Sequence, residues 1–419
     1  MTDLQRNLVD LGKRAVSPLV YVDPEVYRQE QEKIFARSWQ FVGHETQIPN
    51  PGDYVRAPMG EESVILWRAD DGSIGVFLNS CTHRGMPLCR TDGGNGKMLT
   101  CPYHGWSFDL RGRLKGVPAF AETYSDTDKA NWGLIRIPRV ELYRGLIFAC
   151  YDADAVSLED YLGDIRWHLD SIFNRTEGGL RVLPGVHRWD VGANWKFGAE
   201  GLCGDNSHAA VAHSSNAGLF KLSGVKHKAE EGSLQATLSN GNGWIYLREH
   251  PSRKTHAMLK HNEQVLAEAS ERLSDTQREQ IGHFFTGTVF PNFSLLYAGC
   301  TTLRVWQPLA HNRTRVWSWT LADADASPEV IEDERRRMTL FFSPSGVVEQ
   351  DDGVLWESCQ QTLEAGVMRR SFPLNYQQGG IAERRLTDTE RPGTVEIAPT
   401  EAPLIGFYHR WCSDMGIDQ

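Results

Sequence analysis

The sequence lacks the features that mark membrane, secreted and nucleotide-binding proteins. No run of about 18 apolar residues occurs anywhere in its 419 residues. The opening stretch MTDLQRNLVDLGKRAV has no continuous apolar segment of the kind found in secretory signals. Neither a GxGxxG motif after a predicted strand nor a GxxxxGK[ST] loop is present. We therefore expect a cytoplasmic protein without a membrane partner and without a nucleotide-binding loop of its own.

Cysteine is scarce, and positive charge is in the minority. The eight cysteines are too dispersed for a disulfide scaffold, so we expect free thiols or metal ligands. The formal net charge is -10, with 44 Lys and Arg against 54 Asp and Glu. No dense basic cluster occurs, which argues against a nucleic-acid partner. We expect other proteins and small molecules as partners.

The sequence pattern changes near residue 40, from a helical pattern to strand-like runs. The segment DPEVYRQEQEKIFARSW (23–39) begins with an aspartate cap and a proline at the first helical position, which predicts a short helix. From about 40 to 153, β-branched and aromatic runs alternate with turns. The segment ADDGS between two apolar runs predicts a hairpin, because Asp and Gly accept the positive φ of a tight turn. This stretch predicts a small antiparallel β domain.

The rest of the chain, from 154 to 419, alternates between helical and strand patterns. Helices are predicted at LEDYLGDIRWHLDSIF, EQVLAEASERLSDTQREQI and SPEVIEDERRRMTLFF, the last with a serine cap and early acids. The segments LQATLSNGNGWIYL and TLRVWQPLAHNRTRVWSWTLA predict antiparallel strands. The predicted fold class is α+β, with a small antiparallel β domain inserted ahead of a larger domain. In that larger domain we expect an antiparallel sheet flanked by helices, similar to a helix grip.

Two similar phrases in the β-rich part carry the first chemical signal. CTHRG and CPYHGW each contain one cysteine and one histidine, and residues 84–100 lie between the first histidine and the second cysteine. The candidate ligands are Cys81, His83, Cys101 and His104. Thiolates and imidazoles on neighbouring loops can close around a tetrahedral zinc ion or around a cluster of two irons and two sulfides.

The pairing of these ligands separates the two alternatives. A zinc finger pairs its cysteines in CxxC and places its histidines together on a helix, whereas each phrase here contributes one of each. The mixed pairing is the Rieske pattern, in which one loop gives a thiolate to one iron and an imidazole to the other. We therefore predict a Rieske [2Fe-2S] cluster. Such a cluster moves electrons and binds no substrate, so the chemistry needs a second site.

The stretch NWKFGAEGLCGDNSHAAVAH (194–213) carries the second signal. Two imidazoles and one carboxylate on one face of an iron form the facial triad of non-haem oxygenases. His208 and His213 are five residues apart, which is about 140° of rotation on an ideal helix. Both can face one metal only if the helix is distorted, for example by a π-bulge. On this spacing alone, a capped or solvated histidine pair is the alternative.

At this point the sequence resembles a known family. Residues 38–155 resemble the Rieske domain of ring-hydroxylating oxygenase large (alpha) subunits of the naphthalene and biphenyl dioxygenase type, and 194–213 resembles their NWKxxxENxxxDxYHxxxxH signature. The matching positions, in order, are Asn194, Trp195, Lys196, Glu200, Asp205, His208 and His213. The resemblance implies a Rieske domain at 38–155 and a catalytic domain made of 1–37 and 156–419.

The resemblance also implies the third ligand of a mononuclear Fe(II). GVVEQDDGVLW (346–356) is similar to the family segment that carries it, with Asp352 at the ligand position beside His208 and His213. The alternative for Asp351 and Asp352 is a DDG turn on the surface. Asp205 should link His208 to His104 of a neighbouring chain, which implies a trimer of alpha subunits.

The surroundings of the iron are where this chain departs from the family. The family asparagine after the glutamate is Gly201 here, and the tyrosine before the first ligand histidine is Ser207. Both changes remove bulk or hydrogen bonding near the iron. By analogy, the substrate-binding positions are Gly201, Leu202, Ala209, Leu296 and Val348.

The function implied by the resemblance is that of a terminal oxygenase component. Such a component hydroxylates, most often dihydroxylates, an aromatic compound with O2. Its electrons come from NAD(P)H through a separate reductase, a ferredoxin or both, and a small beta subunit (α3β3) or a homotrimer is expected. One alternative is a Rieske electron-transfer or redox-sensing protein with a non-catalytic second domain, which Gly201 and Ser207 suggest. A second alternative is a zinc-stabilised binding module.

Overall fold

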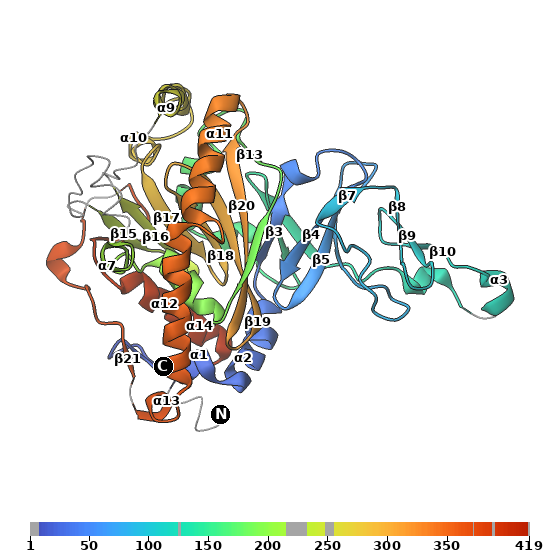
Figure 1. The fold of residues 1–419 in the computed structure, drawn as a ribbon, viewed down its shortest axis with the longest axis horizontal. Coiled ribbons are helices and arrows are strands. Elements are labelled where there is room, and N and C mark those ends of the chain that lie inside the picture. Colours follow the sequence, from blue (N-terminus) through green and yellow to red (C-terminus); the bar gives the residue numbers. More distant parts are fainter. Residues whose placement is uncertain are drawn as a thin grey trace. The chain divides into compact units, whose positions relative to one another are not determined.

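The computed structural model describes residues 8–124, 127–214, 233–247, 255–371, 373–387 and 390–417. The chain divides into two compact units, Phe35–Leu158 and a larger unit made of Met1–Ile34 with Glu159–Gln419. The small unit is therefore an insertion between the N-terminal segment and the rest of the large unit (Figure 1). The boundaries inferred from the sequence, 38–155, stay a prediction for the limits of the small domain.

The small unit is built from short antiparallel strands, as predicted. Its strands are β3 (Gln40–His44), β4 (Asp53–Met59), β5 (Glu62–Arg68), β6 (Ile74–Leu78), β7 (Gly93–Asn95), β8 (Met98–Thr100), β9 (Ser107–Asp109), β10 (Leu114–Gly116), β11 (Arg139–Tyr143) and β12 (Leu146–Cys150). They form three sheets, with the orders β6-β5-β4-β7, β10-β9-β8 and β11-β12-β3. One short helix, α3 (Phe120–Thr123), and two 3-10 turns, Glu45–Gln47 and Lys129–Trp132, complete this unit among the described residues.

The predicted ADDGS hairpin joins β5 to β6. Gly72 has a φ of +81°, which an L side chain rarely adopts, and its N–H donates to the carbonyl of Ala69 at 3.0 Å. The strands that it joins carry Ile65, Trp67 and Phe77 into a core that also contains both cysteines of the two phrases. The hairpin thus closes one side of the apolar core beneath the cysteine-containing loops.

Among its described residues, the large unit is organised around one antiparallel sheet of nine strands. Their order is β13-β20-β19-β18-β17-β16-β15-β22, and β14 pairs with β20 as well. The strands are β13 (Leu180–Val182), β14 (His187–Val191), β15 (Leu234–Thr237), β16 (Gly243–Leu247), β17 (Phe284–Val289), β18 (Phe293–Tyr297), β19 (Thr301–Ala310), β20 (Arg313–Asp323) and β22 (Thr394–Ile397). A separate small sheet holds β1 (Val9–Asp10), β2 (Ala15–Val16) and β21 (Leu374–Asn375). The α+β class is confirmed.

Helices of the large unit flank this sheet. They are α1 (Leu19–Val22), α2 (Pro24–Glu30), α4 (Leu158–Leu162), α5 (Ile165–Phe173), α6 (Trp195–Cys203), α7 (Ala209–Ala212), α9 (His256–Ala269), α10 (Asp275–Arg278), α11 (Pro328–Arg337), α12 (Val347–Glu364), α13 (Met368–Ser371) and α14 (Ala402–Met415). The predicted caps are present: Asp23 accepts from the Glu25 N–H at 2.8 Å, and Ser327 accepts from the Val330 N–H at 3.3 Å. Two predicted helices are each broken in two, at Gly163 and before Ser274, which caps α10.

Two helices, α6 and α12, bring the candidate residues to the sheet. In Figure 1, α12 runs across the face of the large sheet, and α7 lies beside it. Gly198 of α6 leaves room for the Trp306 ring of β19, because an added Cβ would come within 2.3 Å of that ring. Trp306 in turn meets Trp356 of α12 edge to face, with ring centroids 5.6 Å apart. This pair of tryptophans joins the two helices over the sheet.

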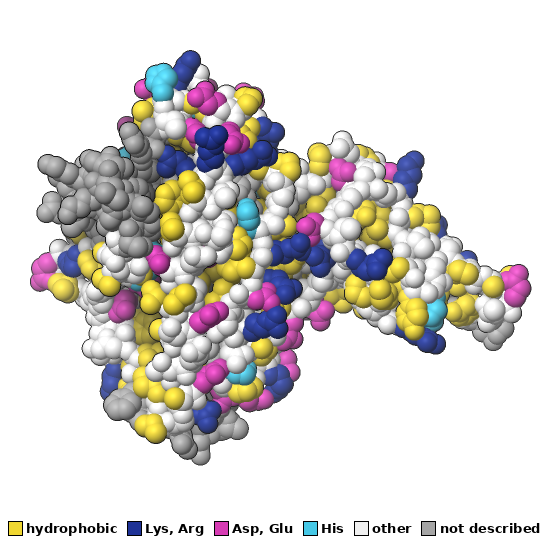
Figure 2. Space-filling view, in the orientation of Figure 1, with side chains coloured by type: hydrophobic (Ala, Val, Ile, Leu, Met, Phe, Trp, Pro, Cys, Tyr) yellow, Lys and Arg dark blue, Asp and Glu magenta, His cyan; other side chains and the backbone are white. Residues whose placement is uncertain are grey.

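The visible surface mixes charges of both signs. On the face drawn in Figure 2, lysine and arginine side chains are interspersed with aspartate and glutamate side chains. Within the described part of the chain, no helix is long and apolar enough to cross a bilayer.

Candidate metal centres

The two cysteine–histidine phrases form two loops with the same backbone geometry. The Cys81 N–H donates to the Met86 carbonyl at 2.9 Å, and the Cys101 N–H donates to the Trp106 carbonyl at 2.7 Å. In each loop a glycine turns back toward the cysteine, and Gly85 and Gly105 have φ of +72° and +74°. The repeated phrase in the sequence is thus a repeated structure.

Side chains of the same kind meet across the two loops. The Nδ1 atoms of His83 and His104 lie 3.1 Å apart, and their rings are 4.5 Å apart between centroids. Burial raises the pKa of the Cys81 thiol, and the neighbouring Cys101 thiol adds to that rise. Both cysteines are buried, and the His83 ring stacks on Trp106 at 4.9 Å. The structure therefore brings the four predicted ligands together as one thiol pair and one imidazole pair.

This separation into pairs fits a two-iron cluster better than a single metal ion. Ligands of one tetrahedral ion would place all donor atoms within a few ångströms of one another. Among the described residues, His208, His213 and Asp352 are the group found with three ligand atoms close together, so these four donors are not gathered around one point. Two irons bridged by sulfides, with thiolates on one and imidazoles on the other, need this kind of spacing.

The second predicted site is built differently from the expected distorted helix. α6 ends at Cys203, and α7 is a single short helix of four residues. His208 directly precedes α7 and His213 directly follows it. The prediction of one helix with a π-bulge is therefore wrong. With one short helical turn between them, both rings turn to the same side, with centroids 5.4 Å apart.

Asp352 joins these two histidines from a distant part of the chain. The three residues offer ligand atoms that all lie within 4.8 Å of one another. Asp352 Oδ1 is 3.6 Å from His208 Nε2 and 3.5 Å from His213 Nε2. The DDG segment lies inside α12, so the alternative of a surface turn is wrong. Two imidazoles and one carboxylate are the donor set that non-haem iron sites use.

Each histidine of this group also has an outer acid. His208 Nδ1 lies 3.3 Å from Asp205 Oδ2, and His213 Nδ1 lies 3.3 Å from Asp351 Oδ2. The Nδ1 atoms thus lie beside outer carboxylates, while both Nε2 atoms point to Asp352. Acid–histidine pairs of this kind fix the tautomer and the ring orientation of a metal-binding histidine. Sequence reasoning missed Asp351 as the partner of His213, although its place beside Asp352 was the available signal.

Burial and neighbouring charges shift the pKa values of the side chains in this site. Burial disfavours charge on His208, but the pairing of its ring with the Asp205 carboxylate and the charges of Asp205 and Asp352 raise its pKa to about 9. Burial raises the pKa of Asp352 to about 7. Burial and the charge of His208 lower the pKa of His213. For Asp205, burial is outweighed by the hydrogen bond and charge of His208, and its pKa is lowered. A divalent cation bound between these side chains would take the place of the proton on His208.

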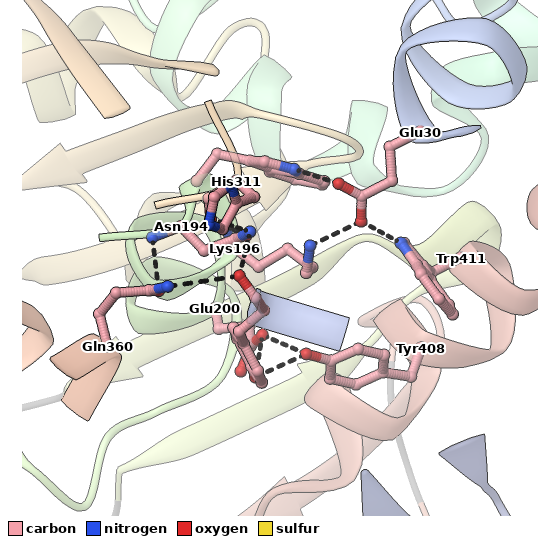
Figure 3. A network of polar contacts seen from close by, with 10 residues as sticks. Glu30, Asn194, Lys196, Glu200, His311, Gln360, Tyr408 and Trp411 are labelled. Atoms are coloured by element: carbon pink, nitrogen blue, oxygen red, sulfur yellow. Dashed lines mark hydrogen bonds and ion pairs between the residues drawn. The ribbon is translucent and has the colours of Figure 1, made fainter. Parts of the chain in front are cut away.

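A buried ion pair anchors α6, which leads into the histidine segment. Lys196 Nζ lies 2.6 Å from Glu30 Oε1, and both side chains are fully buried. The same carboxylate accepts hydrogen bonds from the indole N–H groups of Trp195 and Trp411, at 2.9 and 2.8 Å (Figure 3). Asn194 caps α6 by accepting from the Lys196 N–H at 3.1 Å. These residues of the family signature connect α1, α2, α6 and α14, so their role is structural.

The two departures from the family signature have local consequences. A Cβ at Gly201 would lie 3.4 Å from Trp356 Cζ2, so the indole occupies the space next to this glycine. The Ser207 hydroxyl donates to Gln378 Oε1. Of the other positions named by analogy, Leu202 and Leu296 are buried on α6 and β18, Ala209 begins α7, and Val348 lies in the first turn of α12.

Comparisons with known proteins cover both parts of the chain. Residues 38–137 match the Rieske [2Fe-2S] domain, and residues 158–387 match the ring hydroxylating alpha subunit (catalytic domain). The chain is 40% identical over 415 residues to biphenyl 2,3-dioxygenase subunit alpha of Rhodococcus jostii (strain RHA1), covering 96% of this chain and 89% of that protein. It is 38% identical to benzene 1,2-dioxygenase subunit alpha of Pseudomonas putida, covering 97% and 92%.

A solved structure extends the comparison to three dimensions. Naphthalene 1,2-dioxygenase from Rhodococcus sp., bound to indole, superimposes with a TM-score of 0.89 at 32% identity, covering 99% of this chain and 98% of that one.

The chain belongs to the ring-hydroxylating oxygenase alpha-subunit family. It is the terminal oxygenase alpha subunit of a Rieske aromatic ring-hydroxylating dioxygenase, as the resemblance in the sequence implied. It has a Rieske [2Fe-2S] domain, and its His208, His213 and Asp352 are consistent with a mononuclear iron site. The non-catalytic and zinc-module alternatives are set aside.

Proposed function

We propose that this alpha subunit dihydroxylates an aromatic hydrocarbon with O2 at the site formed by His208, His213 and Asp352. The observation that carries the proposal is the convergence of these three donors from α7 and α12. Three protein ligands on one side would leave the other side of an iron open. When bound there, ferrous iron would supply the activation of O2, and the chain would hold it through His208 Nε2, His213 Nε2 and an Asp352 oxygen.

We propose Cys81 and Cys101 as ligands of one iron of the cluster, and His83 and His104 as ligands of the other. The proposal is supported by the meeting of the thiols on one side and of the Nδ1 atoms on the other. Within the chain, both cysteines are buried, and the two histidines are partly exposed. An electron would leave the cluster on that histidine side.

Asp205 is proposed as the link between the two centres of neighbouring chains. Its side chain is 40% exposed, although one of its oxygens lies beside His208 Nδ1. An acid in this position can accept a second hydrogen bond from outside the chain, and we assign it to His104 of another copy. The link would fix the tautomer of both imidazoles. It requires a trimer of alpha subunits, alone or with a small beta subunit.

The proposed substrate is an apolar aromatic of one or two rings. Relatives are named for biphenyl and benzene, and the solved structure is a naphthalene dioxygenase. The proposed lining, with Gly201, Leu202, Ala209, Leu296 and Val348, is small or aliphatic, which suits a flat apolar ring. Electrons are proposed to come from NAD(P)H through a separate reductase, a ferredoxin or both, in the cytoplasm.

The test is a turnover assay with product identification. The iron-loaded protein is supplied with NADH, a surrogate reductase and ferredoxin, O2, and benzene, biphenyl or naphthalene in turn. The expected product is a dihydrodiol carrying both atoms of one 18O2 molecule. A fully loaded, reducible protein that consumes no O2 with any of these rings, and forms no hydroxylated product, would refute the proposal.

A further inference from the structure

A buried ion pair joins the first turn of α12 to the large sheet. Glu349 stands three positions after Gly346, the N-cap of α12, and its Oε2 lies 2.7 Å from Nη1 of Arg304 on β19. Both side chains are 2% exposed. The other Arg304 nitrogens, Nε and Nη2, have no hydrogen-bond partner among the described residues. One short contact between the helix and the strand therefore carries the compensation of these two buried charges.

Two aromatic rings hold Arg304 in place. Its guanidinium lies over the rings of Trp306 and Phe342, at 5.8 and 5.9 Å from their centroids. Trp306 lies two residues later on the same face of β19, and its indole N–H donates to Ser294 Oγ of the neighbouring strand β18 at 2.9 Å. Phe342 ends the π-helical turn Met338–Phe342, which precedes α12. Arg304 is thus packed both by the sheet and by the segment that leads into α12.

The metal-ligand position of α12 lies on the same helix face as Glu349. Glu349, Asp352 and Trp356 follow one another at spacings of three and four residues, which places them in one row along the helix. At the far end of this row, Trp356 meets Trp306 edge to face, with ring centroids 5.6 Å apart. Both partners of the row, Arg304 and Trp306, belong to β19. Asp352 is therefore located between two contacts that fix α12 on one strand.

The charges of the ion pair also reach Asp352. Burial has the largest effect on the pKa of Asp352 and raises it, while the charge of His208 lowers it. The Glu349 carboxylate raises this pKa further, and the Arg304 guanidinium lowers it. Because these last two effects oppose each other, the intact pair places compensated charge beside the proposed metal ligands. Removing one partner would leave the other as a buried, uncompensated charge.

We propose, on the basis of the proposed oxygenase function, that Arg304 and Glu349 are positioning residues of the mononuclear iron site. Their contact sets the position and the rotation of the first turns of α12 on β19. It thereby holds Asp352 Oδ1 at 3.6 and 3.5 Å from the Nε2 atoms of His208 and His213. The pair acts on the metal through Asp352, since a small shift or rotation of α12 would carry this carboxylate away from both imidazoles.

Titration with Co(II) tests this role without turnover. The anaerobic protein carries its oxidised [2Fe-2S] cluster, and Co(II) is added to the mononuclear site. Glu349→Gln removes one charge of the pair and keeps the size of the side chain. We expect it to bind Co(II) about tenfold more weakly than the parent or worse, with a changed EPR spectrum of the bound ion, because Asp352 is displaced. An affinity and a spectrum equal to those of the parent would overturn the proposal.

The matched control is another buried arginine–carboxylate pair of the same unit. Arg175 Nε lies 2.8 Å from Asp323 Oδ1, the two side chains are 7% and 4% exposed, and Asp323 ends β20. Asp323→Asn should lower the free energy of unfolding, as Glu349→Gln does, because each variant leaves a buried arginine without its partner charge. Its Co(II) affinity and EPR spectrum should stay those of the parent. An equal loss of Co(II) affinity in both variants would trace the effect to lowered stability and refute the positioning role.

A second variant separates position from charge and covers the case in which Glu349→Gln fails to fold. Glu349→Asp keeps the carboxylate but shortens the side chain by one methylene, so it can meet Arg304 only if α12 shifts. We expect weaker Co(II) binding and a changed EPR spectrum here too, and parent-like values would contradict the proposal. A parent protein that binds no Co(II) at His208, His213 and Asp352 would instead refute the mononuclear site on which the proposed function depends.

Discussion

The two proposed metal sites of this chain are encoded in opposite ways. The four proposed cluster ligands lie within 24 residues of one another, from Cys81 to His104, and each loop is closed by its own backbone hydrogen bonds. The proposed mononuclear site takes two histidines from the ends of α7 and an aspartate from α12, 144 positions after His208. A local site depends on its loops, whereas a dispersed site depends on the packing of helices on a sheet. Substitutions can therefore separate the two centres.

The largest difference between the two centres is expected for Asp352, which belongs only to the mononuclear site. Asp352→Ala should abolish mononuclear iron binding and lower product formation by about a thousandfold or more, because two histidines alone hold iron weakly. The visible spectrum of the [2Fe-2S] cluster should not change. Iron analysis and absorbance check both results, with the exposed Gln350→Ala on the same helix as control. Loss of the cluster spectrum in Asp352→Ala would contradict the independence of the two sites.

A smaller effect is expected at the acid that we propose to connect the two sites. Asp205→Asn should keep both centres but slow electron transfer from the cluster to the mononuclear site by about a hundredfold, because the linking charge is lost while every ligand remains. Rapid-mixing spectroscopy of the pre-reduced cluster measures this rate. Unchanged cluster oxidation in the variant, with both centres filled, would contradict the link.

The second outer acid offers a matched comparison with Asp205. Asp351→Asn should weaken metal binding by about tenfold, because Asp351 orients His213 without any proposed role in electron transfer. Isothermal titration of the anaerobic protein with Co(II) checks the affinity. The rate of electron transfer in the reloaded variant should match that of the parent. A slowing as large as that of Asp205→Asn would contradict the different roles assigned to the two acids.

A graded change in metal affinity is expected from pH alone. Metal binding needs a neutral His208 and an ionised Asp352, whose pKa values are raised to about 9 and about 7. Co(II) affinity should therefore fall by about tenfold for each pH unit below 9, and more steeply below 7, where Asp352 also takes a proton. Cluster absorbance, in contrast, should stay constant from pH 7 to pH 9. A Co(II) affinity that is independent of pH in this range would contradict the protonation scheme.

The same contrast explains what could be predicted from the sequence. The ADDGS hairpin, the Asp23 and Ser327 caps and the doubled loops are local, since each depends on residues a few positions apart. The α+β class followed from the change of periodicity along the chain. The proposal of a two-loop cluster needed only the spacing of cysteine and histidine within hairpins.

What could not be predicted depends on tertiary packing. The break between α6 and α7 puts His208 and His213 at the two ends of one short turn, and nothing in their spacing of five indicated this. Asp352 lies in a helix because α12 packs over β19 through Trp356 and Trp306, which overrides the turn preference of DDG. The role of Asp351 beside His213 likewise appears only when α7 and α12 meet.

The central claim is that one chain holds a two-iron cluster and, separately, a single iron. Metal and acid-labile sulfide analysis of the anaerobically reconstituted protein tests it most directly. We predict about three irons and about two sulfides per chain, falling to about two irons with unchanged sulfide in Asp352→Ala. Two irons in the parent protein, or a parallel loss of iron and sulfide in the variant, would contradict the account.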